Sequence, residues 1–363
     1  MKKTSKTHSL ARTLSLAAPV VLALAAVACG GSQPAGEKAQ PAAGQAQQIN
    51  GAGATFPYPI YSKWFDEYHK KNPLMQINYQ SIGSGGGIRQ ISNETVFFGA
   101  TDGPMTEEQL KAAPRPILHF PTVLGADVPV YNLTGVTADL KFTGPILADI
   151  FLGKIKKWND PAIAKVNEGV SLPATDITVV HRSDGSGTTY IWADYLSKVS
   201  PEWKARVGVS TAVNWPAGVG GKGNEGVAGL VSQTPGSIGY VELIYALQNK
   251  IAFGSVQNVN GEFVKATTES VTAAAAAAAA QMPPDFRVSI TNAAGAGAYP
   301  VSSFTWLLLY QEPKDLRQSK AMVDFMKWAL TDGQQFASQL GYAPLPADVV
   351  KQELAALEQV KVG

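Results

Sequence analysis

Segments that favour strands alternate with amphipathic helical segments along most of this chain. Strand patterns occur at residues 76–80, 176–182, 237–242 and 302–310, and helical patterns at residues 60–70, 186–198, 224–233, 316–330 and 347–360. This alternation predicts an α/β fold with largely parallel sheets. The chain has 363 residues, which is long for a single core and predicts two domains.

Two further segments have a distinctive composition. Residues 117–131 are a long apolar stretch that contains Pro121 and Pro129. Proline within such a stretch predicts edge strands or a crossover between sheets. Residues 273–280 are all alanine, and because alanine is the best helix former we expect a plain surface helix there.

The N-terminus has the three parts of a secretory signal. A basic opening with Lys2, Lys3 and Arg12 precedes an apolar run at residues 14–28, and the run ends in Ala26-Val27-Ala28. A basic region, a short apolar region and small residues predict export and removal of residues 1–28. The run is shorter than the roughly 20 apolar residues of a membrane span.

Cys29, the only cysteine, follows that run directly. The stretch resembles a bacterial lipobox, which implies lipidation of Cys29 and attachment of the protein to a membrane. The match is imperfect, because Ala26 stands where the lipobox usually has leucine, and an ordinary signal peptide is the alternative. Residues 29–48 are rich in Gly, Ser, Pro, Ala and Gln and predict a flexible tether.

Charge and composition narrow the class of ligand. Charged residues make up 16% of the chain and the formal net charge is +2, so binding of nucleic acid by bulk electrostatics is not expected. An anionic ligand would have to be held by local dipoles and hydrogen bonds. The four histidines, His8, His69, His119 and His181, share no metal-ligand spacing. We therefore expect no metal and no cofactor, and packing or surface roles for His69 and His119.

The motifs of nucleotide and hydrolase chemistry are incomplete. Gly221-Lys222-Gly223 lacks the hydroxyl residue that follows lysine in a phosphate-binding loop. Ser84 and Ser186 are each flanked by glycines, but neither has the Gly-x-Ser-x-Gly spacing of a nucleophile elbow. A triad assembled from distant residues stays open as an alternative.

Three glycine-rich segments place hydroxyl residues at expected helix starts. They are residues 51–57 with Thr55, residues 82–87 with Ser84, and residues 182–189 with Ser186 and Thr188. Helix N-termini present free N–H groups and a positive dipole end, which bind anions without a full charge. A hydroxyl at such a position is often only a helix cap, so each segment alone is a weak signal.

In these segments and in others along its length, the chain resembles the phosphate-binding proteins of bacterial phosphate ABC importers, the PstS type. The resemblance runs from about residue 49 to the C-terminus and is carried by ordered matches. These are residues 51–61, 79–90, 98–104, 120–123, 152–159, 181–188, 215–226, 236–242 and 342–346. Gly85, Thr101 and His181 depart from the residues that many members have at those positions.

The resemblance implies a set of phosphate contacts. Thr55, Phe56 and Ser84 resemble donors, Asp102 the carboxylate that accepts a hydrogen bond from the proton of phosphate, and Arg182 the one charged donor. Asp184 resembles the ion-pair partner of Arg182, and Ser186, Gly187 and Thr188 resemble donors at a helix start. No catalytic residue is implied.

The chemistry of these residues agrees with that ligand. Phosphate keeps a proton at neutral pH and sulfate does not, so a buried Asp102 would accept a hydrogen bond from phosphate but face a second acceptor in sulfate. Two alternatives remain open on residues alone. Asp102-Gly103-Pro104 also predicts a turn, and Arg182 with Asp184 also fits an ordinary ion pair at a strand end.

The resemblance further implies a two-lobed binding-protein fold with ligand in the cleft. One lobe would combine residues 49–125 with 301–363 and the other would be residues 126–300, with residues 117–131 and 302–310 as crossover strands. The implied function is delivery of inorganic phosphate to the permease of an ABC importer by an exported protein, expected to be a monomer. A phosphatase or esterase using Ser84 or Ser186, and an adhesin with a vestigial site, are the alternatives.

Overall fold

The computed structural model describes residues 46–279 and 282–363. The predicted signal peptide, Cys29 and most of the predicted tether lie outside these residues. Strand β1 begins at Gln47, so the last two residues of the predicted tether belong to the sheet. Within the described ranges, no helix combines the length and the apolar character that crossing a membrane requires.

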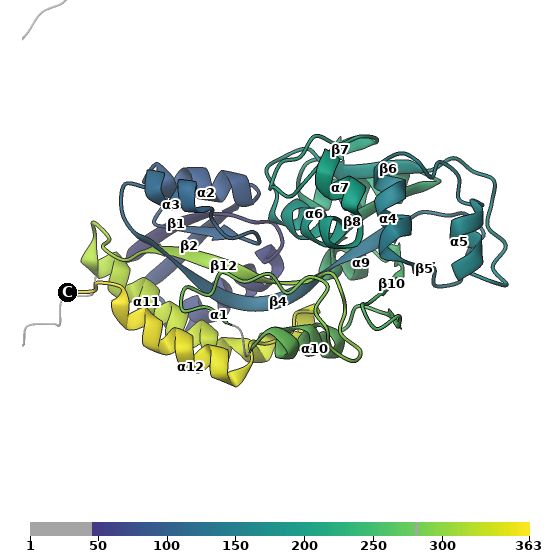
Figure 1. Cartoon of the computed structure of the whole chain (residues 1–363). Helices are drawn as coiled ribbons and strands as arrows, with labels where there is room; N and C mark the ends of the chain where they lie inside the picture. Colours follow the sequence, from purple (N-terminus) through teal and green to yellow (C-terminus); the bar gives the residue numbers. More distant parts are fainter. Residues whose placement is uncertain (1–45, 280–281) are drawn as a thin grey trace, which may run out of the picture. The chain divides into compact units, whose positions relative to one another are not determined.

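The main sheet consists of two parallel groups of strands with an antiparallel centre (Figure 1). Its order is β2 (Met75–Ser81), β1 (Gln47–Gly53), β3 (Phe98–Thr101), β12 (Ser302–Tyr310), β4 (Ile117–Tyr131), β8 (Ser237–Glu242), β6 (Thr178–Arg182) and β7 (Val219–Gly221). Pairing is parallel among β2, β1 and β3 and among β8, β6 and β7, whereas β12 and β4 pair antiparallel with their neighbours. The α/β class is confirmed, but the prediction of largely parallel sheets is wrong at the centre.

Strand β4 changes its partner halfway along. Ile117 to Ala126 pair with β12, and Asp127 to Tyr131 pair with β8. We call β2, β1, β3, β12 and the part of β4 up to Ala126 the first half of the sheet. The part of β4 from Asp127 onward, with β8, β6 and β7, is the second half. The predicted crossover is therefore present, and the part of β4 before Asp127, whose strand partner is β12, lies at the edge of its half of the sheet. Pro121 is tolerated inside the sheet because the register with β12 shifts between Thr305 and Trp306, where a bulge interrupts the ladder.

Helices cover both faces of the first half (Figure 1). On one side lie α11 (Leu316–Leu330) and α12 (Ala347–Ala356), and on the other α2 (Ser84–Ser92) and α3 (Glu107–Ala112). Helix α1 (Tyr58–Lys71) packs beside α11, where Phe65 and Tyr68 contact the ring of Phe325. Helix α11 is amphipathic as expected, since Met322, Phe325 and Ala329 lie buried on one face.

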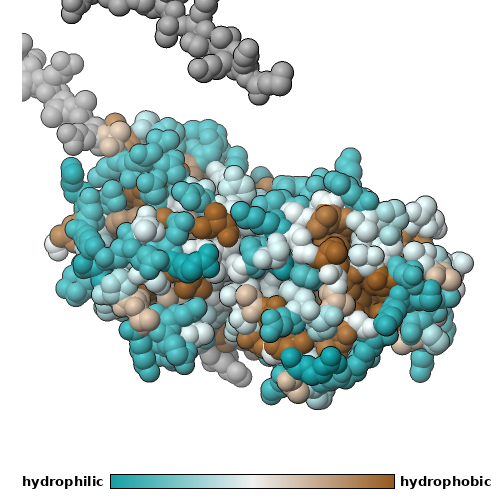
Figure 2. All heavy atoms as spheres, turned by 90° about the horizontal axis from the view of Figure 1, so that it is seen from above, coloured by the Kyte–Doolittle hydropathy of each residue, from teal (hydrophilic) through white to brown (hydrophobic). Residues whose placement is uncertain are grey.

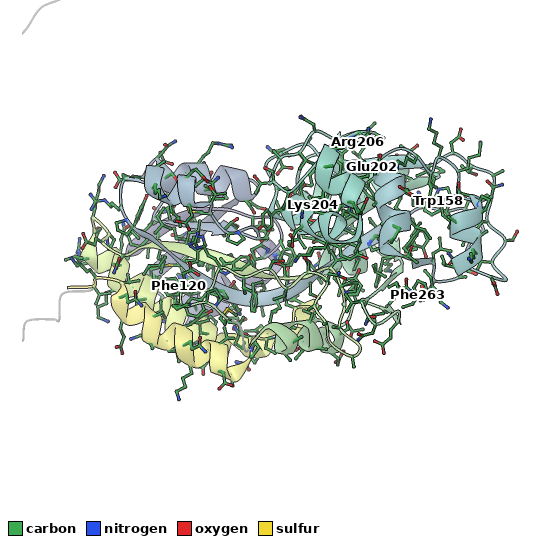
Figure 3. All side chains as sticks on the ribbon, in the orientation of Figure 1. Phe120, Trp158, Glu202, Lys204, Arg206 and Phe263 are labelled. Atoms are coloured by element: carbon green, nitrogen blue, oxygen red, sulfur yellow. The ribbon has the colours of Figure 1, made fainter. Side chains whose placement is uncertain are left out.

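The second half carries most of the remaining helices. They are α4 (Gly144–Phe151), α5 (Pro161–Val166), α6 (Gly187–Val199), α7 (Pro201–Arg206), α8 (Gly223–Gln233) and α9 (Leu243–Gln248). Helix α10 (Thr268–Ala279) instead packs against β4 and β12. Figure 3 shows Trp158 among the side chains of this half and Phe120 among those of the first, and both are buried. Helix α10 buries Ala274 and Ala275, whereas Ala276 and Ala277 are exposed, so the expected surface helix packs one face against the protein.

Short elements complete the described fold. A small sheet contains β11 (Phe263–Val264), β10 (Ser255–Gln257) and β5 (Lys141–Phe142), and β9 (Ala252–Phe253) pairs with β4. The expected C-terminal helix ends at Ala356 and continues as a 3-10 turn over Leu357–Gln359. On the face drawn in Figure 2, hydrophobic residues form separate patches among hydrophilic ones.

Candidate functional site

The predicted site residues come from both halves of the sheet. Thr55 and Phe56 follow β1, Ser84 begins α2, and Asp102 follows β3. Arg182 ends β6, and the loop after it leads through Ser186 into α6. The loops touch, because the N–H of Gly85 donates to the carbonyl oxygen of Gly185 at 2.9 Å. The structure therefore brings the predicted residues of the two halves to one place.

Only one of the three hydroxyl segments caps a helix. Ser186 is the N-cap of α6 and its Oγ accepts from the N–H of Thr189 at 3.0 Å. Helix α2 has Gly83 at its N-cap, which leaves Ser84 as the first helical residue, and α1 has Pro57. Residues 84–87 are therefore the first turn of α2. Thr55 and Ser84 direct their hydroxyls to other groups.

Asp102 is buried and held by hydroxyl groups. Its Oδ1 accepts from Thr305 Oγ1 at 2.7 Å, and its Oδ2 lies 3.4 Å from Ser84 Oγ. Burial raises the pKa of Asp102 to about 7, although the hydrogen bond from Thr305 and the charge of Arg182 act against that rise. The carboxyl group of Asp102 therefore gains or loses its proton near neutral pH. It can donate a hydrogen bond when protonated and only accept when ionised. The turn that Asp102-Gly103-Pro104 predicts is also present, closed by a hydrogen bond between the N–H of Gly103 and Thr101 Oγ1.

Arg182 and Asp184 form a bidentate ion pair. Nε and Nη2 of Arg182 donate to Oδ1 and Oδ2 of Asp184 at 2.8 and 2.6 Å, and the arginine side chain is 1% exposed. Burial would raise the pKa of Asp184, but the hydrogen bond and charge of Arg182 outweigh it and the pKa is lowered. Because the pair is neutral as a whole, an anion here would depend mainly on uncharged donors.

The approach of the two loops leaves no room for side chains at two glycines. A Cβ on Gly187 would lie 2.4 Å from Ser84 Oγ and 2.5 Å from Asp102 Oδ2. A Cβ on Gly83, whose φ is +85°, would lie 2.3 Å from Asp184 Oδ2. Glycine at these positions therefore lets the backbone of one half reach the polar side chains of the other.

Several residues of this network escaped sequence reasoning. Asn224 contacts Thr55 and Thr188, Tyr245 Oη donates to the carbonyl of Thr55, and Tyr342 Oη donates to that of Phe56. Asn224 directly follows the glycine cluster at residues 218–223, and that position was its only signal. Thr305, which holds Asp102, lies inside a strand with no local signal.

The described departures from the resembled family leave this network intact. His181 stacks on Trp215 with ring centroids 4.8 Å apart, and burial lowers its pKa. It therefore adds no positive charge beside Arg182 at neutral pH. His119 is buried and its Nε2 accepts from the N–H of Met105, so it has the packing role that the sequence suggested.

Comparisons with known proteins agree on one family. A profile of the PBP superfamily domain matches residues 38–333. The phosphate-binding protein PstS of Xylella fastidiosa, strain Temecula1, is 51% identical over 326 residues, which are 89% of this chain and 89% of that protein.

Solved structures share the fold. A high affinity periplasmic phosphate-binding protein bound with phosphate superposes with a TM-score of 0.68 at 22% identity, over 87% of this chain and 96% of that one. An ABC-type phosphate transport receptor from Vibrio cholerae gives a TM-score of 0.54 at 18% identity, over 82% and 100%. The two-lobed fold is therefore confirmed.

Two further buried carboxyl groups, those of Asp127 and Glu242, lie close to the site, where β4 changes partner. Asp127 and Glu242 are register partners in antiparallel strands, so their side chains share one face of the sheet. Neither oxygen of Asp127 has a hydrogen-bond partner among the described residues, and Glu242 has one, the N–H of Ile244. Burial, with the charges of Asp102 and Glu242 next, raises the pKa of Asp127 well above its ordinary value.

We predict that Asp127→Asn makes the protein more stable than the wild type at pH 8. At pH 4 the gain in stability over the wild type should be much smaller. A raised carboxyl pKa stabilises the folded state fully below the unfolded value of about 3.9, and that contribution is lost as the pH rises through the folded value. The amide has no such loss. We expect a gain of about 1–3 kcal/mol in the free energy of unfolding at pH 8, measured by denaturant titration.

The exposed Asp139→Asn variant is the matched control and should show the pH dependence of the wild type. An Asp127→Asn variant that follows the wild-type curve at both pH values would contradict this account of Asp127.

Proposed function

Because the chain belongs to the PstS-type phosphate-binding proteins of the PBP superfamily, we propose that Thr55, Phe56, Ser84, Arg182, Ser186, Gly187 and Thr188 donate to inorganic phosphate. The protein captures phosphate and serves an ABC importer. The observation that supports this site most is the buried Asp102 among neutral donors from both halves of the sheet.

Each group has a chemical role in this proposal. The hydroxyls and the N–H groups at the starts of α2 and α6 donate to phosphate oxygens, aided by the helix dipoles. Arg182 contributes its planar donor fork, and Asp184 offsets its charge through the ion pair. Asp102 accepts the hydrogen bond from the proton that phosphate retains, which sulfate cannot supply.

Closure of two lobes around the ligand is part of the proposal. We assign residues 49–125 and 301–363 to one lobe and residues 126–300 to the other. The change of partner in β4 between Ala126 and Asp127 supports this limit. Thr55, Ser84 and Asp102 then belong to one lobe and Arg182 to Thr188 to the other, so phosphate that contacts both favours the closed form.

The proposal includes no chemical step on the ligand. Ser186 Oγ is occupied as a helix cap, and Ser84 Oγ contacts Asp102. The nearest histidine in sequence to Ser186 is His181, whose Nδ1 contacts the carbonyl of Arg182. Neither serine has a histidine as a hydrogen-bond partner in the described part of the chain, which gives the hydrolase alternative no support.

Membrane attachment rests on the N-terminal sequence. PstS-type proteins act outside the cytoplasm, so this chain is exported. We propose that Cys29 becomes lipidated after removal of residues 1–28, and that the folded part acts as a monomer on a tether.

Calorimetric titration with phosphate and sulfate tests the proposed function. We expect phosphate to bind about a hundredfold or more tightly than sulfate at pH 8.5, because sulfate places two acceptors face to face. The preference should narrow at pH 5.5, where Asp102 with a pKa of about 7 carries a proton and can donate to sulfate. Equal affinities at pH 8.5 would refute the selectivity.

The variant Asp102→Asn tests the acceptor itself. An amide can donate to either anion, so we expect the preference for phosphate to fall to about tenfold or less and to lose its dependence on pH. Thr305→Val removes the hydrogen bond to Asp102 and keeps the carboxylate, so it should retain a pH-dependent preference. Unchanged discrimination in Asp102→Asn would remove Asp102 from this role.

The variant Cys29→Ser tests the anchor. Lipidation requires the thiol, so the full-length wild-type chain should partition with membranes and label with a fatty-acid analogue, and Cys29→Ser should do neither. Phosphate affinity of the folded part is the control and should not change. A soluble, unlabelled wild-type protein would show that Cys29 is not lipidated.

A further inference from the structure

Asn224 is fully buried and connects predicted donors from the two halves of the sheet. Its Nδ2 donates to Thr55 Oγ1 at 2.7 Å and to Thr188 Oγ1 at 3.1 Å. Thr55 belongs to the loop after β1, whereas Thr188 belongs to the first turn of α6. One amide group therefore bridges hydroxyls from the two halves of the sheet.

The orientation of this amide is determined by its neighbours. The backbone N–H of Glu242 points to the other side-chain atom of Asn224 at 3.0 Å. Because an N–H can only donate, that atom must be Oδ1, and the atom facing the two threonines must be the NH2 group. The backbone N–H of Asn224 also lies 3.3 Å from Thr55 Oγ1.

Both hydroxyls consequently act as acceptors toward the protein. Thr55 Oγ1 accepts from two N–H groups of Asn224. Thr188 Oγ1 accepts from Asn224 and, at 3.2 Å, from Nη1 of Arg182, which cannot accept. A hydroxyl has two acceptor positions and one proton. With both acceptor positions used, the proton of each threonine is left for a third group.

We propose that Asn224 is a positioning residue that turns the hydroxyl protons of Thr55 and Thr188 toward the ligand. The inference rests on the proposed function and extends it. Asn224 does not touch the anion in this account. It makes the two threonines donors only, which favours unprotonated oxygens of phosphate at these positions.

The opposite polarity is set on the other side of the site. Thr305 Oγ1 donates to Asp102 Oδ1, which directs Asp102 Oδ2 toward the start of α6, close to the backbone of Gly187. Two side chains outside the predicted phosphate contacts, Asn224 and Thr305, thus determine which groups of the site donate and which accept hydrogen bonds. Asn224 makes donors of the threonines and Thr305 orients the acceptor, so the proton of phosphate has one favourable direction.

The test compares Asn224→Asp with Asn224→Ala by calorimetry with inorganic phosphate. In Asn224→Ala the hydroxyls lose their orientation but keep their protons, and we expect about a tenfold loss of affinity. In Asn224→Asp a carboxylate oxygen replaces the NH2 group and accepts both hydroxyl protons. We expect a loss of about a hundredfold or more at pH 8.5, part of which is recovered at pH 5.5 as the new carboxyl is protonated.

Asn132→Asp is the matched control. Asn132 Nδ2 donates to the carbonyls of Val231 and Ser232, so its replacement introduces the same chemical change away from the site. It should lower the unfolding temperature without changing phosphate affinity relative to the wild type. The unfolding temperatures of both Asn224 variants, measured without phosphate, show how far each is destabilised.

The possible outcomes distinguish failure of the proposed phosphate binding from failure of the role proposed for Asn224. A wild-type protein that does not bind phosphate overturns the proposed function. A wild-type protein that binds phosphate, with equal affinity losses in Asn224→Ala and Asn224→Asp at both pH values, assigns Asn224 a structural role and overturns this inference. A larger and pH-dependent loss in Asn224→Asp alone supports it.

Discussion

The change of hydrogen-bonding partner along β4 is the constraint on which the site depends. One strand pairs with β12 up to Ala126 and with β8 from Asp127, so β4 takes part in both halves of the sheet. Loops after β1, β3 and β6 are brought together across that junction. Parallel strands end at the same edge, which is why binding loops gather there in α/β folds. The bulge next to Pro121 lets the proline remain inside the part of β4 that pairs with β12.

The polar groups at this junction are arranged to avoid net charge. Arg182 is buried, and its ion pair with Asp184 leaves little charge to attract an anion by itself. Truncating one partner of such a pair would leave an uncompensated buried charge, so the pair is best regarded as a unit. The nearby carboxyls of Asp102, Asp127 and Glu242 all have raised pKa values because burial disfavours their charged forms. In the proposed function, an anion is then held by dipoles and neutral donors, and its own proton becomes a recognition element.

Much of the fold and the candidate site was predictable because the relevant signals are local. Helix α11 was predicted from spacing alone, and the glycine-rich segments at Ser84 and Ser186 lie at helix starts as expected. The bland interpretation of those segments as caps is right for Ser186 and wrong for Ser84. Antiparallel pairing at the centre was not predicted, because the direction of a strand relative to a distant neighbour leaves no local pattern. Asn224 and Thr305 were missed because their partners lie 169 and 203 residues away in sequence.

Local patterns in the chain determined its α/β class, its export signal and the residue types of the proposed anion site. Those properties follow from periodicity, composition and short spacings, each of which acts over a few neighbouring residues. Only the tertiary structure decided which groups contact the hydroxyls of Thr55, Ser84 and Thr188, where Asp102 points and how Arg182 is neutralised. These depend on hydrogen bonds between segments that meet only after folding. The physical reason is that the direction of a hydroxyl proton is set by every acceptor and donor around it, and no stretch of sequence contains that surrounding set.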